Sequence, residues 1–179
     1  MRAVLDANVL FPTILREILA DLAGAGLYAP LWSPRILAEW RHAAARLGPD
    51  QDAVAGAEIA LLRDRFPAAE VPDDGIRAID GDFPDPADRH VVEAALAGEA
   101  KLIVTANLRD FPQALMAGLG LRALHPDAFL LDLFAADPVA VTAAVRTARD
   151  KAAVMGSDMT ATEMLRRCRL PRLAKAVKG

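Results

Sequence analysis

Short apolar segments alternate with longer segments of mixed polarity along most of the chain. The short segments are rich in Ala, Val, Ile and Leu, and they predict strands at residues 2–8, 27–32, 101–105 and 121–124. The longer segments repeat their apolar residues every three or four positions, and they predict helices at residues 14–22, 33–47, 51–65, 87–96 and 111–116. Strands that alternate with helices predict an α/β fold with a parallel sheet covered on both faces.

The rest of the chain lacks this alternation. Residues 67–86 are rich in Pro, Gly and Asp and predict mostly loop, with room for one short strand. After Pro126 the pattern is helical, with helices predicted at residues 127–135, 138–153, 160–168 and 171–177. Sites in parallel sheets form beyond the carboxyl ends of the strands. Polar residues that directly follow the predicted strands are therefore the first candidates for a functional site.

Composition limits the kinds of protein that the chain can be. Its 179 residues suit one domain with an appendage. The single cysteine, Cys168, excludes an intramolecular disulfide framework and a thiolate zinc cluster, and an ordinary small side chain is the simplest interpretation. No apolar run is long enough to cross a bilayer, and the first residues lack the apolar stretch of a signal peptide. We therefore expect a cytoplasmic protein.

Charge is distributed unevenly along the chain. Residues 1–140 contain 12 Lys and Arg against 21 Asp and Glu, a balance of −9, whereas residues 141–179 contain 9 against 3, a balance of +6. An acidic body with a basic tail suits metal binding in the first part and phosphate binding in the second. A solvated helix face explains the basic residues equally well.

Asp6 and Asn8 lie at the end of the first predicted strand. A lone carboxylate in a buried strand is costly unless it is paired or binds a metal ion, so Asp6 is a candidate metal ligand. Asn8 would point to the same side of a strand, where it can orient Asp6 or a bound water. The structural alternatives are an Asp that caps the following turn and an Asn that forms a turn.

Glu39 lies at the border of the apolar stripe of the helix predicted at residues 33–47. Ser33 is a suitable N-cap for this helix, which fixes where it begins. A Glu at such a border is either a solvated surface residue or a side chain directed into a site. The neighbouring Trp40 is better explained as a core residue than as a platform for base stacking.

Asp85 and Asp88 begin the helix predicted at residues 87–96. Asp85 suits an N-cap and Asp88 complements the positive end of the helix dipole, so structural roles explain both. The same helix start is also a favourable place for carboxylates that hold a divalent cation. Arg89 and His90 follow, and His90 is either a phosphate contact or an ordinary surface histidine.

Thr105, Asn107 and Asp110 follow the strand predicted at residues 101–105. The Thr105 hydroxyl can hold a carboxylate or phosphate oxygen, or it can simply end the strand. Asp110 precedes a predicted short helix, and capping and catalysis explain it equally well. Separate segments thus each place a carboxylate at a strand end or a helix start, and Mg²⁺ needs such oxygen ligands. A metal ion held there would activate water and neutralise a phosphate during in-line attack.

Four motifs resemble the PIN-domain family, and specifically toxins of the VapC type. They are Val4-Leu5-Asp6-Ala7-Asn8, the helix that carries Glu39, Pro84-Asp85-Pro86-Ala87-Asp88-Arg89-His90-Val91, and Ile103-Val104-Thr105-Ala106-Asn107-Leu108-Arg109-Asp110-Phe111. Their order and spacing suit the family over residues 1–125. The opening Leu-Asp-x-Asn is weak by itself, and the combination is more specific.

The resemblance implies a three-layer α/β/α sandwich with a mainly parallel sheet, and Mg²⁺- or Mn²⁺-dependent cleavage of RNA. Carried over, Asp6, Glu39 and Asp88 would bind metal. The family's fourth acid usually follows the Thr by two residues, where this chain has Asn107. Asp110 would replace that acid, or Asn107 would act as a neutral ligand, and binding of a second metal ion stays open. Such toxins are paired with a small antitoxin protein that covers the acidic site, and many form homodimers.

The resemblance also divides the chain into a nuclease domain over residues 1–125 and a basic helical extension over residues 126–179. The basic side chains of the extension are candidates for contacts with RNA phosphates, above all Arg146, Arg149, Arg166 and Arg167. Packing against an acidic antitoxin is the alternative use.

Two other classes of protein stay open. A phosphatase of the haloacid dehalogenase type also has an Asp after its first strand, but Asn8 stands where such enzymes need a second Asp. A PIN-like module that binds RNA without cleaving it would keep the fold, and Asn107 favours that interpretation.

Overall fold

A sheet of four short parallel strands organises the protein. The computed structural model describes residues 1–75 and 83–178. Its strands are β1 (Arg2–Leu5), β2 (Ala29–Leu31), β3 (Leu102–Val104) and β4 (Arg122–Leu124). They lie in the order β2-β1-β3-β4, and all neighbouring strands run parallel. In this register Leu5, the last residue of β1, lies opposite Val104, the last residue of β3.

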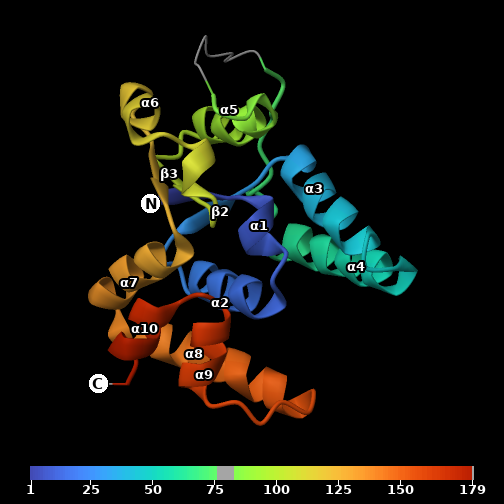
Figure 1. The fold of residues 1–179 in the computed structure, drawn as a ribbon, viewed down its shortest axis with the longest axis vertical. Helices are drawn as coiled ribbons and strands as arrows, with labels where there is room; N and C mark the ends of the chain where they lie inside the picture. The colour runs from blue at the N-terminus through green and yellow to red at the C-terminus, as the bar shows by residue number, and fades with distance from the viewer. Residues whose placement is uncertain (76–82, 179) are drawn as a thin grey trace.

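Helices cover both faces of the sheet. The first part of the chain contains α1 (Ala7–Leu10), α2 (Thr13–Gly24), α3 (Pro34–Ala45), α4 (Pro49–Arg65), α5 (Arg89–Ala97) and α6 (Gln113–Gly118), with the short 3-10 turns η1 (Pro86–Asp88) and η2 (Leu108–Asp110). In Figure 1, α5 and α6 lie on one side of the strands and α2 lies on the other. The protein is therefore the three-layer α/β/α sandwich that the sequence predicted.

Four further helices follow β4. They are α7 (Pro126–Ala136), α8 (Pro138–Val154), α9 (Ala161–Arg167) and α10 (Pro171–Ala176). α8 packs along α2, and α10 packs against α7 and α9 (Figure 1). The buried carboxylate of Asp127 holds the start of α10, because it accepts hydrogen bonds from the backbone N–H groups of Arg172 at 3.0 Å and Leu173 at 2.9 Å. The last helix is thereby anchored to α7.

One apolar core extends from the sheet into the C-terminal helices. Val4 in β1, Ile18 in α2 and Phe129 in α7 are all fully buried in it. The predicted boundary between residues 125 and 126 falls where β4 gives way to α7, and the division into two domains stays a prediction. Within the described ranges, no helix is both long enough and apolar enough to span a membrane.

One local prediction differs from the structure. The first strand ends at Leu5, because the Asp6 carbonyl accepts hydrogen bonds from the N–H groups of Val9 and Leu10 and begins the turn of α1. Asn8 therefore lies in a helix and not in a strand. Residues 67–75 and 83–85 contain no strand, and only an isolated bridge forms between Trp32 and Glu70. Residues 76–82 lie outside the described part of the chain.

Candidate functional site

The order of the strands places a topological switch point, here called the crevice, at the carboxyl end of the sheet. The chain passes from β1 to β2 by way of α2 on one face, and from β2 to β3 by way of α5 on the other, so the winding reverses between β1 and β3. Open α/β sheets bind their ligands at such a reversal. Asp6 directly follows β1 and Thr105 directly follows β3. Both side chains therefore lie at the point where the fold favours a site.

A network of hydrogen bonds fixes Asp6 in this crevice. Its Oδ2 accepts hydrogen bonds from the Thr105 hydroxyl at 2.7 Å and from Asn8 Nδ2 at 2.5 Å. Asn8 Oδ1 accepts a hydrogen bond from the Ala106 N–H at 2.9 Å, which joins the start of α1 to the loop after β3. The Thr105 hydroxyl accepts the N–H of Asn107 at 3.1 Å. Asn8 and Thr105 thus set the direction of the Asp6 carboxylate.

The surroundings of Asp6 oppose its negative charge. The residue is only 6% exposed, and burial raises the pKa of its carboxyl group above the usual value. The hydrogen bonds from Thr105 and from the Ala7 backbone lower that pKa, whereas the charge of Glu39 raises it again. A cation in the crevice would stabilise the ionised form.

Glu39 reaches the crevice from α3. Its Oε1 lies 2.9 Å from His90 Nε2 and 3.4 Å from Arg35 Nε. Burial acts to raise the pKa of Glu39, but His90 and Arg35 together bring it below the usual value. Arg35 also donates to the Ala87 carbonyl at 3.1 Å. This contact ties α3 to η1, the turn that ends at Asp88.

Asp88 and Asp110 meet from two 3-10 turns that are far apart in the sequence. Burial is the largest cause that raises the pKa of Asp88 to about 7, and a shared hydrogen bond with Asp110 follows. The negative charges of Asp110, Asp6 and Asp85 raise it further. Asn107 Nδ2 donates a hydrogen bond to the Asp110 carboxylate. The negative charge of Asp88 is therefore unfavourable at this position, because the group is partly buried and lies beside other acids.

The donor set suits a hard divalent cation. Asp6, Glu39, Asp88 and Asp110 offer carboxylate oxygens, which Mg²⁺ and Mn²⁺ prefer as ligands. Burial, and after it Asp110 and Asp6, raise the pKa of Asp88, and a bound cation would favour its ionised form. Within residues 1–75 and 83–178, however, no three His, Cys, Asp or Glu side chains are already placed to hold an ion.

Two residues predicted for the start of α5 have clear structural partners. Asp85 caps η1, because its Oδ1 accepts the N–H of Ala87 at 2.8 Å. His90 is 4% exposed and faces Glu39. The expectation of a surface histidine is therefore wrong, since α5 turns this ring inward against α3. In this position the His90 ring lies against the Glu39 carboxylate, and its contact with RNA stays a prediction.

The remaining predicted basic residues lie outside this crevice or at its rim. Arg89 is half-exposed, with its Nε 3.9 Å from Glu93 Oε1. The four arginines singled out in the extension belong to α8 and α9: Arg146, Arg149, Arg166 and Arg167. Figure 1 shows these two helices at the opposite end of the molecule from α5, whose start carries Asp88. The structure does not bring the basic extension to the candidate site.

Sequence reasoning missed Arg35, which contacts both Glu39 and the backbone beside Asp88. Arg35 lies four residues before Glu39 on α3. Side chains at this spacing meet on one face of a helix, so the signal was present in the sequence. It did not show that the same arginine would reach another segment.

Comparisons with known proteins agree with this architecture. The family model described as PIN domain matches residues 2–109, which include Asp6, Glu39 and Asp88. A curated protein of Mycobacterium tuberculosis, named "Putative ribonuclease VapC50", is 51% identical over 45 residues. That match covers 25% of this chain and only 27% of the mycobacterial protein.

No solved structure matches the chain. The haloacid dehalogenase alternative gains no support from these comparisons. The PIN-domain match covers more than half of the chain and extends from β1 into η2. It therefore includes the switch point of the sheet and three of the four acidic residues gathered there. This chain belongs to the PIN-domain family.

Proposed function

We propose that the protein is a Mg²⁺- or Mn²⁺-dependent endoribonuclease that hydrolyses RNA phosphodiesters in the cytoplasm. Membership of the PIN-domain family supports nuclease chemistry. The local similarity to a protein named as a ribonuclease supports RNA as the substrate. The proposed metal ligands are the carboxylates of Asp6, Glu39, Asp88 and Asp110.

One observation carries the proposal, which is that the negative charge of Asp88 is unfavourable at the switch point. Burial and the neighbouring Asp110 and Asp6 raise the pKa of Asp88 to about 7. Perturbed acids in a crevice are typical of functional sites, and a divalent cation is the simplest group that would balance them. A role as helix caps would not account for the proximity of these acids to one another.

A bound Mg²⁺ or Mn²⁺ would supply an activated water and would neutralise the charge of the phosphate. The surrounding side chains keep the ligands in place. Thr105 and Asn8 hold Asp6 by hydrogen bonds, and His90 and Arg35 hold Glu39 from the side of α5 and α3.

Asn107 contributes to the proposed metal site through its contact with Asp110. Its amide donates to the Asp110 carboxylate, at the position where the family usually has an acid. We assign Asp110 the role of that acid and Asn107 the role of its neutral support. The count of bound metal ions, one or two, is then measurable as the stoichiometry of Mn²⁺ binding.

We further propose that the protein is the toxin of a toxin–antitoxin pair and works as a homodimer. The PIN-domain membership and the local match to a protein named VapC50 support the toxin assignment. A small antitoxin that covered the acidic crevice would keep the nuclease inactive. A short reading frame directly upstream should encode such a protein, and its product should bind the purified chain and stop cleavage. If the purified product does neither, the pairing is wrong.

The helices of residues 126–179 are proposed to bind RNA phosphates away from the crevice. Deleting them would expose the core, because α8 packs along α2. Gln substitutions of the exposed arginines on α8 and α9 are the cleaner test. They should weaken RNA binding and reduce its dependence on salt. Unchanged affinity at several salt concentrations rejects the assignment.

Cleavage of RNA by the purified chain tests the main proposal. Activity should require Mg²⁺ or Mn²⁺, stop with EDTA, and disappear in Asp6→Asn and in Asp88→Asn while circular dichroism shows an intact fold. Activity without metal, or full activity in both variants, would point to a different chemistry.

A second candidate is a PIN-like module that binds RNA without cleaving it. Asn107 in place of an acid favours it, as does the lack of a preformed group of three ligands among the described side chains. This alternative predicts RNA binding without cleavage at any concentration of Mn²⁺.

A further inference from the structure

A buried arginine stands between the elements that carry Asp6 and Glu39. Arg16 belongs to α2 and is only 4% exposed. Taking a guanidinium out of water is costly unless its partners are well placed. We propose that Arg16 is a positioning residue that fixes the Asp6 turn relative to the Glu39 helix. This inference rests on the proposed function.

Arg16 first secures the short helix that begins at Asp6. Its Nη1 donates to the Leu10 carbonyl at 2.7 Å and to the Phe11 carbonyl at 3.2 Å. A helix of four residues cannot satisfy its own last carbonyls, so α1 depends on this outside donor. The turn held in this way directly follows Asp6 and contains Asn8.

The same guanidinium also packs against α3. Its central carbon lies 4.6 Å from the ring centre of Trp40, a favourable cation–π distance. Trp40 is 2% exposed and directly follows Glu39 in the chain. The Arg16 guanidinium therefore contacts the turn that follows Asp6 and the residue that follows Glu39. Asp6 and Glu39 are both proposed metal ligands.

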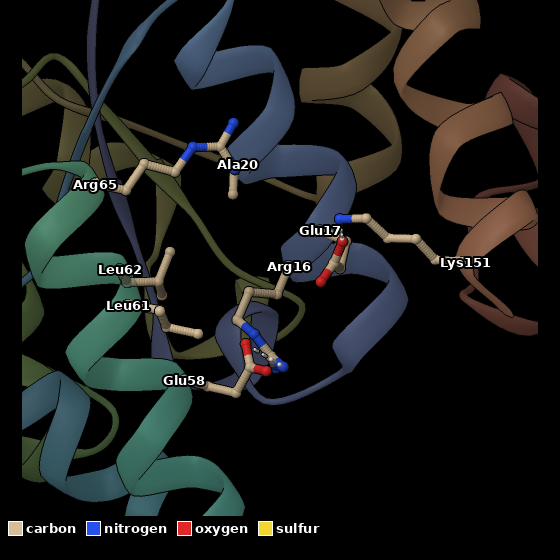
Figure 2. A pocket seen from close by; sticks show the side chains of 8 residues that line it. All are labelled: Arg16, Glu17, Ala20, Glu58, Leu61, Leu62, Arg65 and Lys151. Atoms are coloured by element: carbon tan, nitrogen blue, oxygen red, sulfur yellow. Dashed lines mark hydrogen bonds and ion pairs between the residues drawn. The ribbon is translucent and has the colours of Figure 1, made fainter. Parts of the chain in front are cut away.

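Glu58 of α4 provides the opposite charge. Arg16 Nη2 lies 3.5 Å from Glu58 Oε2, and Figure 2 shows the two side chains pointing toward each other. They border a cavity of about 160 Å³, and Glu17 on the same wall pairs with Lys151 of α8. Burial lowers the pKa of Arg16, and the charges of Glu58 and Glu17 oppose this effect. The guanidinium therefore keeps partners on three elements.

An arginine at this buried position is informative about function, because stability alone does not favour a buried ion pair. Apolar side chains that replace a buried ion pair are often neutral or stabilising. A planar guanidinium adds several contacts of fixed direction at once, which neither a lysine nor an apolar chain reproduces. Loss of Arg16 should therefore disturb the geometry of the metal site beyond its effect on the fold.

Mn²⁺ binding by the full chain, without RNA, tests the proposal. Arg16→Met and Arg16→Lys should each bind Mn²⁺ about tenfold more weakly than the wild type, which is the loss typical of groups that orient metal ligands. Asp127→Ala is the matched control, because it weakens the fold at α10, away from the crevice. It should bind Mn²⁺ like the wild type. Unchanged affinity in Arg16→Met, or an equal loss in Asp127→Ala, overturns the proposal.

Amide hydrogen exchange of the metal-free protein separates this inference from the proposed function. Arg16→Met should speed exchange at residues 7–11 more than Asp127→Ala does, after both are corrected for global stability. If the wild type binds no Mn²⁺, the proposed metal site fails, and exchange alone decides whether Arg16 holds this turn. Unchanged exchange there overturns the positioning role. If Arg16→Met does not fold, Arg16→Lys and Glu58→Gln are compared with Asp127→Ala in the same two measurements.

Discussion

Replacing Asp88 by Asn removes a negative charge from a partly buried position where Asp110 and Asp6 also repel it. The pKa of Asp88 is about 7 in the folded chain, against 3.8 for an ordinary Asp. The folded chain therefore binds more protons than the unfolded chain between these values, and its stability falls as the pH rises through this range. The penalty is complete above pH 7 and absent below about pH 4. Asp88→Asn should remove it.

The size of the effect follows from the same pKa values. Their difference corresponds to roughly 4 kcal/mol if the charge were fully shielded from water. Asp88 is only half-buried, so solvent screening reduces the figure to about 1–2 kcal/mol. Loss of a favourable charge at the start of α5 subtracts about 0.5 kcal/mol. We expect Asp88→Asn to raise the free energy of unfolding by about 1 kcal/mol at pH 8.

Urea denaturation followed by circular dichroism, with EDTA present, measures this effect. The gain should be present at pH 8 and largely lost near pH 4. Asp158→Asn, at an exposed position, controls for the general loss of an acid and should show no such dependence on pH. Saturating Mn²⁺ should stabilise the wild type more than Asp88→Asn. A variant that is no more stable than the wild type at pH 8, or a gain that does not depend on pH, would refute the argument from charge repulsion.

Three further outcomes follow from the structure. Affinity for Mn²⁺ should fall about tenfold for each pH unit below 7, because a proton on Asp88 competes with the metal; calorimetry from pH 5.5 to 8 checks this, and a flat profile contradicts it. Thr105→Val removes a donor from the buried Asp6 carboxylate and should cost about 1–3 kcal/mol in urea unfolding, whereas Thr105→Ser should keep most of that stability. Asp127→Ala removes both bonds to the start of α10 and should cost about 1 kcal/mol; equal hydrogen exchange in α10 of the variant and the wild type would argue against this anchor.

Local pattern predicted the elements of this protein well and their ends less well. The strands and helices occur close to the predicted positions, because the spacing of apolar residues depends only on which face each element buries. Asn8 shows where this reasoning fails. Its apolar neighbours suit a strand, but the Asp6 carbonyl binds two following N–H groups and turns the chain into a helix. A competition between two backbone conformations is not visible in the side-chain pattern.

The candidate carboxylates could be proposed from the sequence, but their environments could not. Asp88 is as plausible a helix-dipole partner as a metal ligand until Asp110 is seen beside it. As a polar residue, His90 suits a surface position, but the packing of α5 on the sheet turns its ring toward Glu39. Each outcome depends on two segments that are far apart in the chain.

The sequence by itself determined the α/β class, the approximate elements and the acids worth considering, because these follow from periodicity and from residue chemistry within one segment. Only the tertiary structure decided that the winding reverses between β1 and β3, that Asp6 meets Thr105 there, and that the basic helices lie at the other end of the molecule. The physical reason is that strand order and helix docking arise from packing of the whole core. The interactions that favour one strand order over another form between segments, and no single segment contains them.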